Sequence, residues 1–364
     1  MTSKPANLVY FEQWSDDGAA LPILRDAPGI ALRRLSYATR EDENWAALAC
    51  AHGYQIAARV ELRQPWFGTA ELVRRCPNLL VISSTGAGYD VIDVDACTKA
   101  GVIVCNQTGS NARAVAEHAV GLMLALSKRI VMTDKAVRDA PDTDRFHFTG
   151  NNLHGKTVGI LGLGNIGRIT AQICRAGFDM NVIAHDPLLA ASEIVARGAR
   201  PVSRDDVFSQ ADFVSVHCPR ADDTFGSIGQ REFALMKRSA FFINTARGGI
   251  HREDELAAAL RTGELAGAGL DVFLHEPPAP DHPLMAFANV IANPHIAGMT
   301  AESLASMSEY AARQWLDVFA GRKPTRLVNP AAWPLFSRRY EATFGTAPAT
   351  AAAPPDLASV LPHD

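Results

Sequence analysis

Short apolar runs without polar alternation recur from residue 157 onward, and stretches long enough for helices separate them. Strands that are buried on both faces of a parallel sheet have this pattern, because crossover helices cover both sides. The pattern therefore predicts a βαβ series and an α/β fold. The predicted strands lie at 157–161, 182–186, 213–217, 240–244, 267–272 and 289–292.

The first third of the chain repeats this pattern more loosely. We expect strands at 8–11, 53–59, 79–83 and 102–106, with a helix at 65–75. Two longer helices are predicted at 111–129, which is apolar on most faces, and at 301–319. We therefore expect a small, discontinuous domain at 1–106 and 301–335, with a larger domain at 107–300 inserted in it. The chemistry is expected in the cleft between the two domains. Residues 336–364 are expected to form an Ala/Pro-rich tail.

Composition excludes several classes of function. The 364 residues are 48% hydrophobic and 20% charged with a net charge of −4, so no basic excess exists to hold nucleic acid. The longest stretch without Asp, Glu, Lys or Arg, at 282–301, contains two His, two Asn and two Pro, so no membrane span is expected. Six cysteines without a CxxC pair or a secretory leader predict reduced thiols and a cytoplasmic protein, and no spacing indicates a metal site.

A glycine-rich turn is the sharpest local signal. Gly162, Gly164 and Gly167 follow the strand at 157–161 and open a helix, which is the context of a dinucleotide-binding turn. Gly162 permits the turn, Gly164 lets the backbone approach a pyrophosphate, and Gly167 allows close helix packing. Asp186 ends the next strand, where a carboxylate can accept the ribose hydroxyls and repel a 2'-phosphate. The sequence predicts a Rossmann-type sheet that binds NAD rather than NADP.

Polar residues at the ends of the later strands are candidates for chemistry, because open α/β sheets bind ligands beyond the carboxyl ends of their strands. They include an acid, a base and a fixed cation. These candidates are His217, the segment 244–247, Asp271 with Glu276, and His295.

All of these residues except His217 fall within motifs that resemble the D-isomer-specific 2-hydroxyacid dehydrogenase family. The motifs are VGILGLGNIG, INTARGG, GLDVFLHEP and NPHIAG, and the segment TGAGYDVIDVDACTKAGVIVCNQTGSNARAVAEHAVGLMLAL is similar to the family's region leading into its linker helix. The resemblance covers about residues 50–330. It implies a Rossmann-type NAD-binding domain inserted in a smaller flavodoxin-like α/β substrate-binding domain, without a C-terminal regulatory domain.

The resemblance also implies roles for individual residues. Arg247 would bind the substrate carboxylate, Glu276 would be the acidic partner, and His295 the acid/base. The substrate would also meet Ala87, Gly88 and Arg59. The implied cofactor contacts are Gly162, Gly164, Asn165, Ile166, Gly167, Asp186, His217, Pro219, Thr245, Ala246, Arg247, Asp271, His295 and Gly298.

The chemistry independently requires such residue types. A group that titrates near neutral pH must exchange the hydroxyl proton, and histidine does so. A neighbouring carboxylate favours the protonated ring. A guanidinium binds a carboxylate through two parallel N–H bonds, which lysine cannot copy.

Several alternatives remain open. The leading hypothesis is an NAD-dependent D-2-hydroxyacid dehydrogenase most like phosphoglycerate dehydrogenase, with glyoxylate/hydroxypyruvate reductase as the alternative activity. A non-enzymatic NAD-sensing corepressor is a second class, whereas formate dehydrogenase is disfavoured because that branch has an amide where Glu276 stands. Only Arg59 matches the arginines expected for a substrate phosphate, and Glu61 lies beside it. The apolar side chains of 111–129 predict a homodimer.

Overall fold

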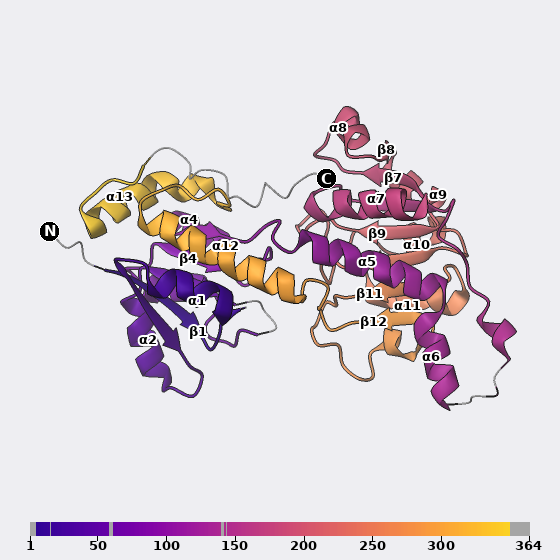
Figure 1. The fold of residues 1–364 in the computed structure, drawn as a ribbon, viewed down its shortest axis with the longest axis horizontal. Helices are drawn as coiled ribbons and strands as arrows, with labels where there is room; N and C mark the ends of the chain where they lie inside the picture. The colour runs from indigo at the N-terminus through magenta and orange to yellow at the C-terminus, as the bar shows by residue number, and fades with distance from the viewer. Residues whose placement is uncertain (1–4, 15, 58–60, 140–141, 143, 350–364) are drawn as a thin grey trace. The chain divides into compact units, whose positions relative to one another are not determined.

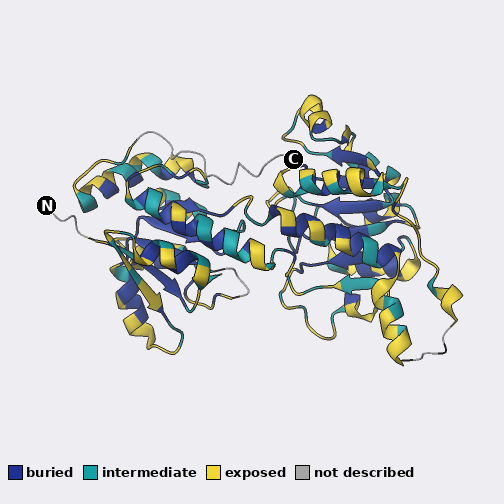
Figure 2. Cartoon of the chain, viewed as in Figure 1, coloured by how far each residue is buried: buried dark blue, intermediate teal, exposed yellow. Residues whose placement is uncertain are grey.

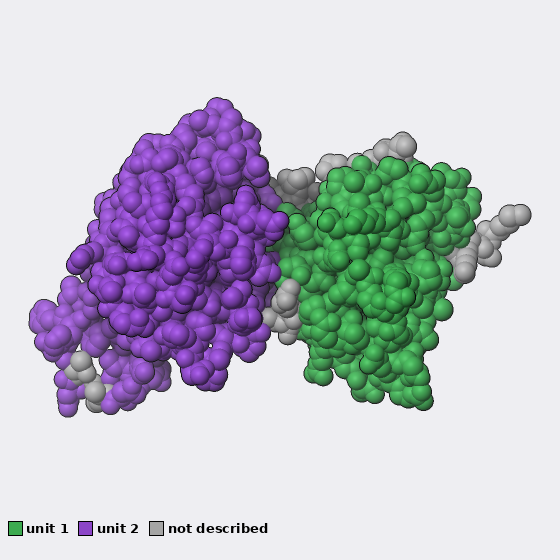
Figure 3. Space-filling view, turned by 180° about the vertical axis from the view of Figure 1, so that it is seen from behind, with its two compact units in different colours: residues 1–111, 301–364 green, residues 112–300 purple. Residues whose placement is uncertain are grey.

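The structure is a computed structural model that describes residues 5–14, 16–57, 61–139, 142 and 144–349. It divides into two compact units (Figure 3). Unit 1 comprises residues 1–111 and 301–364, and unit 2 comprises 112–300. None of the helices in the described ranges has the length and apolar character needed to cross a membrane.

Unit 1 is built on a five-stranded parallel sheet with the order β2-β1-β3-β4-β5 (Figure 1). This is the flavodoxin-like order. The strands are β1 (Ala6–Phe11), β2 (Ile30–Leu35), β3 (Gly53–Ile56), β4 (Val81–Ser84) and β5 (Ile103–Cys105). The helices are α1 (Asp17–Arg25), α2 (Glu41–Ala49), α3 (Ala70–Arg75), α4 (Val94–Ala100), α12 (Ala301–Phe319) and α13 (Trp333–Phe344), with a 3-10 turn η3 (Pro330–Ala332).

Unit 2 holds a seven-stranded parallel sheet with the order β12-β11-β10-β9-β6-β7-β8. The order reverses between β6 and β9, as in a doubly wound Rossmann sheet. The strands are β6 (Thr157–Leu161), β7 (Asn181–His185), β8 (Arg200–Pro201), β9 (Phe213–Val216), β10 (Phe241–Asn244), β11 (Gly267–Leu270) and β12 (Val290–Ala292). The helices are α5 (Ala112–Ser127), α6 (Ile130–Asp139), α7 (Asn165–Phe178), α8 (Ala191–Ala196), α9 (Arg204–Gln210), α10 (Gln230–Leu235) and α11 (Glu253–Thr262), with 3-10 turns η1 (Arg145–Phe148) and η2 (Pro283–Ala286).

The inner strands of both sheets are buried on both faces, as the unalternated apolar runs predict (Figure 2). In unit 2, α5 and α7 cover one face with a core that includes Met123, Ile160 and Ile243. Helices α9, α10 and α11 cover the other face, around Phe208, Phe233 and Phe242. The predicted α/β fold class is confirmed in both sheets.

Three sequence predictions differ from the structure. The strand β2 was not expected, because as an edge strand it carries exposed arginines in place of an apolar run. The helix predicted at 65–75 begins only at Ala70, since the Thr69 side chain caps it by accepting the Leu72 N–H. The tail predicted from 336 begins inside α13, whose Phe336 and Tyr340 are buried in the core of unit 1.

The argument for a homodimer from the helix at 111–129 is also wrong in its premise. The side chains of Val115, Val120, Leu122, Met123 and Leu126 are already buried within the chain. They pack against α7 and the strands β10 and β11, so α5 has no surplus apolar face to cover.

Candidate functional site

The glycine-rich turn joins β6 to α7 at the point where the strand order reverses. Gly162 has a φ of +89°, and a β-carbon there would lie 2.7 Å from the backbone nitrogen of Cys218. At Gly167 a β-carbon would lie 2.2 Å from the Gly162 carbonyl oxygen. Packing therefore requires both glycines. At Gly164, none of the described residues has an atom within 4 Å of such a β-carbon, which leaves the backbone open to a ligand.

The amide groups beside this turn are available to an anion. Gly164 stands at the N-cap of α7 and provides no side-chain cap, so the first turn, with Asn165 and Ile166, presents backbone N–H donors. Asp186 directly follows β7 and accepts hydrogen bonds from the N–H groups of Leu163 at 2.8 Å and Leu188 at 3.0 Å. The Asp186 carboxylate is thus held next to the turn.

Two buried polar atoms near the same sheet edge have no hydrogen-bond partner among the described residues. They are Nδ1 of His217, which follows β9, and Oγ1 of Thr245, which follows β10. Burial lowers the pKa of His217 to about 4, and its Nε2 lies 2.9 Å from the Ser215 hydroxyl, so the ring is neutral near pH 7. Because buried polar groups are normally paired, these two atoms are suited to a polar ligand. Pro219, two residues further on, is exposed.

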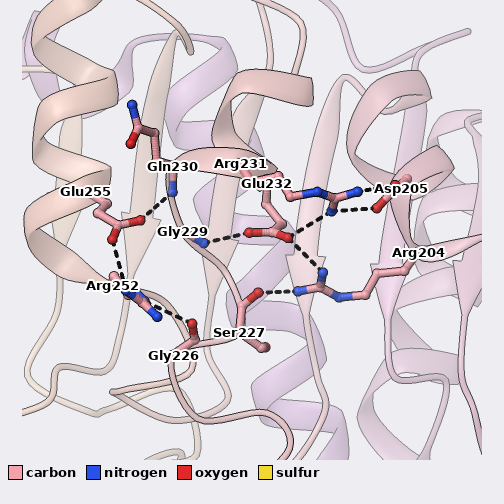
Figure 4. Close-up of polar contacts among 10 residues, drawn as sticks. All are labelled: Arg204, Asp205, Gly226, Ser227, Gly229, Gln230, Arg231, Glu232, Arg252 and Glu255. Atoms are coloured by element: carbon pink, nitrogen blue, oxygen red, sulfur yellow. Dashed lines mark hydrogen bonds and ion pairs between the residues drawn. The ribbon is translucent and has the colours of Figure 1, made fainter.

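A charged network anchors the loop that carries His217 and Pro219 (Figure 4). Arg204 of α9 donates to the Glu232 carboxylate at 2.9 Å and to the Ser227 carbonyl oxygen. Glu232 also accepts the Gly229 N–H and a bond from Arg231. Burial raises the pKa of Glu232, but these hydrogen bonds outweigh it and the pKa is lower than usual. The ionised carboxylate therefore ties the end of the loop to α9 and α10.

Arg247 lies in a tight turn after β10 that Asn244 organises. The Asn244 side chain accepts the Ala246 N–H at 2.9 Å and donates to the Arg247 carbonyl oxygen and to Nδ1 of His251, both at 3.0 Å. The half-buried Arg247 side chain donates to the Ala246 carbonyl oxygen at 2.7 Å. A β-carbon at Gly248 would lie 1.9 Å from the Phe273 carbonyl oxygen, so the turn packs directly on the segment leading to Glu276.

His295 has a left-handed backbone with a φ of +57°, which is uncommon for a residue with a side chain. Its N–H donates to the Asp271 carbonyl oxygen at 2.8 Å. The two carboxylate oxygens of Asp271 accept the N–H groups of Ile296 and Ala297, at 2.8 and 2.9 Å. Asp271 is 1% exposed and so fixes the loop in which His295 and Gly298 lie. Nε2 of His118, on α5, lies 3.2 Å from the Asn293 side chain at the start of this loop.

The side chains of His295 and Glu276 meet directly. Nδ1 of His295 lies 2.8 Å from Oε2 of Glu276, whose other oxygen accepts the Phe273 N–H at 3.0 Å. Burial raises the pKa of Glu276, but the hydrogen bond and charge of His295, the Phe273 N–H and the charge of Arg247 outweigh it, and the pKa is lower than usual. The carboxylate is thus ionised and can accept a hydrogen bond from a proton on Nδ1 of His295, which leaves Nε2 as the ring nitrogen that does not face Glu276.

In unit 1, Ala87 and Gly88 lie in the loop after β4 and are half-exposed. The carbonyl oxygens of Gly86, Ala87 and Gly88 accept hydrogen bonds from the Gln107 N–H, the Asn106 side chain and the Ser84 hydroxyl. Since C=O and the following N–H point in opposite directions in a trans peptide, the amides of Ala87, Gly88 and Tyr89 point away from these partners. Arg59 lies outside the described residues.

Sequence reasoning missed the residues that support the site. Ser215 lies inside a predicted strand and His251 lies just before helix α11, and no motif marks either residue. Asn106 ends a predicted strand and is not among the site residues that the resemblance implies. Their roles arise from contacts between segments distant in the chain, which a single sequence does not display.

Comparison with known proteins agrees with the motifs. Residues 120–297 match the family model "D-isomer specific 2-hydroxyacid dehydrogenase, NAD binding domain". The chain is 38% identical over 260 residues to a D-3-phosphoglycerate dehydrogenase of Archaeoglobus fulgidus, which covers 71% of this chain and 49% of that protein. It is 41% identical over 265 residues to a glyoxylate reductase of Thermofilum pendens, covering 71% of this chain and 78% of that protein.

Among solved structures, the chain resembles D-lactate dehydrogenase of Aquifex aeolicus complexed with NAD and lactic acid. The TM-score is 0.71 at 27% identity, with 84% of this chain and 93% of that chain covered. The chain spans about half the length of the phosphoglycerate dehydrogenase that it matches and most of the glyoxylate reductase. Motifs, fold and relatives agree, and the chain belongs to the D-isomer-specific 2-hydroxyacid dehydrogenase family.

Proposed function

We propose that this protein is an NAD-dependent oxidoreductase that interconverts a D-2-hydroxy acid and the corresponding 2-keto acid. The observation that carries the proposal is the pair of His295 and Glu276, in which the carboxylate holds the proton on Nδ1 and leaves Nε2 without a partner in the described part of the chain. Arg247 lies close enough to influence the same carboxylate electrostatically. An acid/base and a cation for a carboxylate thus share one edge of the sheet.

The residues around the glycine-rich turn fit NAD. The open backbone at Gly164 and the uncapped N-terminus of α7 suit the pyrophosphate, and Asp186 suits the ribose hydroxyls. The unpartnered atoms of His217 and Thr245 provide further polar contacts. When bound, NAD supplies or accepts the hydride at C2 of the substrate. Each Asp271 oxygen accepts one N–H in the structure and retains a lone pair for the cofactor amide.

In the reduction direction, protonated His295 donates the Nε2 proton to the substrate oxygen as the alcohol forms. In oxidation the neutral ring takes the proton back. Glu276 stabilises the charged ring and fixes its orientation, because it bonds Nδ1 while the Phe273 N–H holds its other oxygen. We therefore assign the proton transfer to this pair.

Two features are suited to the substrate carboxylate. In unit 2, the fork of Arg247 binds a carboxylate through parallel N–H bonds. In unit 1, the outward amides of Ala87, Gly88 and Tyr89 are three consecutive N–H groups, and none of them donates to an acceptor in the described ranges.

We infer that small unphosphorylated acids, such as glyoxylate or hydroxypyruvate, are reduced at least as efficiently as 3-phosphohydroxypyruvate. The carboxylate Glu61 follows the segment with Arg59, and it would repel a phosphate at that position. The guanidinium of Arg63 lies 4.8 Å from the centre of the Tyr37 ring, which directs it to the aromatic face. A hundredfold preference for the phosphorylated substrate in kcat/KM would contradict this inference.

The proposed activity is tested by steady-state turnover of NADH with a panel of 2-keto acids. Saturable NADH oxidation with at least one member supports it. Tight NADH binding without turnover of any member would instead favour the non-enzymatic, NAD-sensing alternative.

We also propose a homodimer and a cytoplasmic location. On α6 no residue is buried, and Ile130, Val131 and Val137 are 53%, 52% and 67% exposed, which is an apolar surface suited to a second copy. All six cysteines are free thiols, in agreement with a reducing compartment. A monomer by light scattering at micromolar concentration would contradict the dimer.

A further inference from the structure

The loop after β4 owes its conformation to residues of neighbouring strands. Three consecutive carbonyl oxygens, of Gly86, Ala87 and Gly88, each accept a hydrogen bond from the interior of unit 1. The Gln107 N–H donates to the Gly86 oxygen at 2.9 Å, and the Asn106 Nδ2 donates to the Ala87 oxygen at 2.8 Å. Every peptide plane that is turned inward in this way turns the next N–H outward.

Asn106 is the one side-chain amide in this set, and its orientation is fixed. Its Oδ1 accepts the Thr108 N–H at 3.3 Å, so Nδ2 must face the loop. The residue is 6% exposed and directly follows β5, a strand packed beside β4. The Ala87 peptide itself is only half-buried and has no other partner for its oxygen in the described residues.

The neighbouring residue, Gln107, anchors the same end of the strand. Its fully buried side chain donates to the Ser83 hydroxyl at 3.2 Å, to the Ser84 carbonyl oxygen at 3.2 Å and to Gln314 of α12 at 3.3 Å. The base of the loop is therefore rigid, while the Ala87 peptide depends on Asn106 for its direction.

We propose that Asn106 is a positioning residue for the substrate carboxylate: it turns the Ala87–Gly88 peptide so that the Gly88 N–H, flanked by those of Ala87 and Tyr89, points at the anion. This inference rests on the proposed function and specifies how unit 1 recognises the substrate. Without the Asn106 donor, the Ala87 oxygen is free to rotate outward, where its negative end would meet the carboxylate in place of the N–H dipole.

The test compares N106A with wild type for the best 2-keto acid of the panel and for its uncharged amide. We expect kcat/KM for the acid to fall by about tenfold or more, mainly through KM, and that for the amide to fall by less than about threefold, because hydrogen bonds to a charged group are the stronger ones. Dissociation constants for NADH, measured by fluorescence, should stay within about twofold, since the loop lies in unit 1 and the cofactor residues in unit 2.

Two further variants guard against a purely structural effect. S84A removes the bond to the Gly88 oxygen and should produce the same selective loss for the acid. N78A is the matched control, because the exposed Asn78 side chain also donates to a backbone carbonyl oxygen, that of Ala49 at 2.9 Å, but it precedes β4 whereas the loop follows the other end of that strand. N78A should leave kcat/KM unchanged for both the acid and the amide. Thermal unfolding of all variants shows whether each of them is folded.

The outcomes separate the two proposals. If wild type reduces the acid and N106A loses activity equally for acid and amide, or loses none, the role of Asn106 is refuted while the proposed function stands. If wild type reduces no 2-keto acid, the proposed function fails. Calorimetric binding of oxamate to the NADH-bound protein then tests the role of Asn106 separately. Binding that is weakened by N106A and not by N78A supports this role. Equal affinity of wild type and N106A, or no binding to wild type, refutes it.

Discussion

Replacing Glu276 by glutamine tests the acid/base pair directly. The glutamine keeps the size of the side chain and one oxygen that can face Nδ1 of His295, now 2.8 Å from Oε2 of Glu276, but it removes the negative charge. Reduction of a keto acid requires protonated His295, so activity is present at low pH and is lost as the pH rises. Without the carboxylate the protonated ring is less favoured, and the loss must begin at a lower pH.

The strength of this attraction follows from the geometry. Two unit charges about 4 Å apart attract by about 1 kcal/mol in water and about 4 kcal/mol at an effective dielectric constant near 20. The side chains of His295 and Glu276 are 33% and 14% exposed, which places the pair between these limits. The attraction that E276Q removes is therefore about 1.5–3 kcal/mol. We expect the midpoint of the profile to move to lower pH, with the acid plateau within a fewfold of wild type.

The assay is kcat/KM for the best 2-keto acid with NADH, measured from about pH 5 to 9. E253Q is a matched control, because Oε2 of Glu253 lies 3.0 Å from Nε2 of His282 and its Oε1 accepts the Leu274 N–H. The same substitution in a second Glu–His pair of unit 2 should leave the midpoint unchanged. An unchanged midpoint in E276Q together with lost NADH affinity would refute the reasoning and assign Glu276 a structural role.

Three further predictions concern the cofactor, the substrate and acid stability. Asp186, held by two backbone N–H groups, should favour NADH over NADPH by at least about tenfold in kcat/KM, and D186A should narrow this ratio; equal efficiency in wild type would refute it. R247K should raise KM and lower kcat for keto acids, since a point charge cannot replace the bidentate fork of the guanidinium. Near-normal kinetics would mean that another cation binds the substrate. Burial lowers the pKa of His251 to about 4, so below about pH 6.5 the unfolded state binds the extra proton and the free energy of unfolding falls by about 1.4 kcal/mol per pH unit. Between pH 7 and pH 5, the free energy of unfolding measured in urea should fall by about 2 kcal/mol less in H251Q than in wild type. An equal fall in both proteins would contradict the burial of a neutral ring.

Local sequence determined the parts of this protein that depend on short stretches of chain. Unalternated apolar runs specify parallel strands, because only strands covered on both faces bury such runs, and both sheets have that form. The spacing of Gly162, Gly164 and Gly167 specifies this turn, and at Gly162 and Gly167 no other residue type fits, because a β-carbon would approach the backbone of Cys218 and of Gly162 too closely. The family and the proposed chemistry followed from these motifs together with those around Arg247 and His295.

Tertiary structure alone decided what depends on contacts between distant segments. Helix α13 has a modest apolar content, and only the packing of Phe336 and Tyr340 into unit 1 shows that it is part of the core. The apolar side chains of α5 suggested a surface for a partner until the sheet of unit 2 was seen to cover them. The left-handed backbone of His295 is imposed by Asp271, and the direction of the Ala87 peptide by Asn106. A single sequence displays the residue types, but it does not display which donor meets which acceptor, because that is set by the folding of remote segments onto one another.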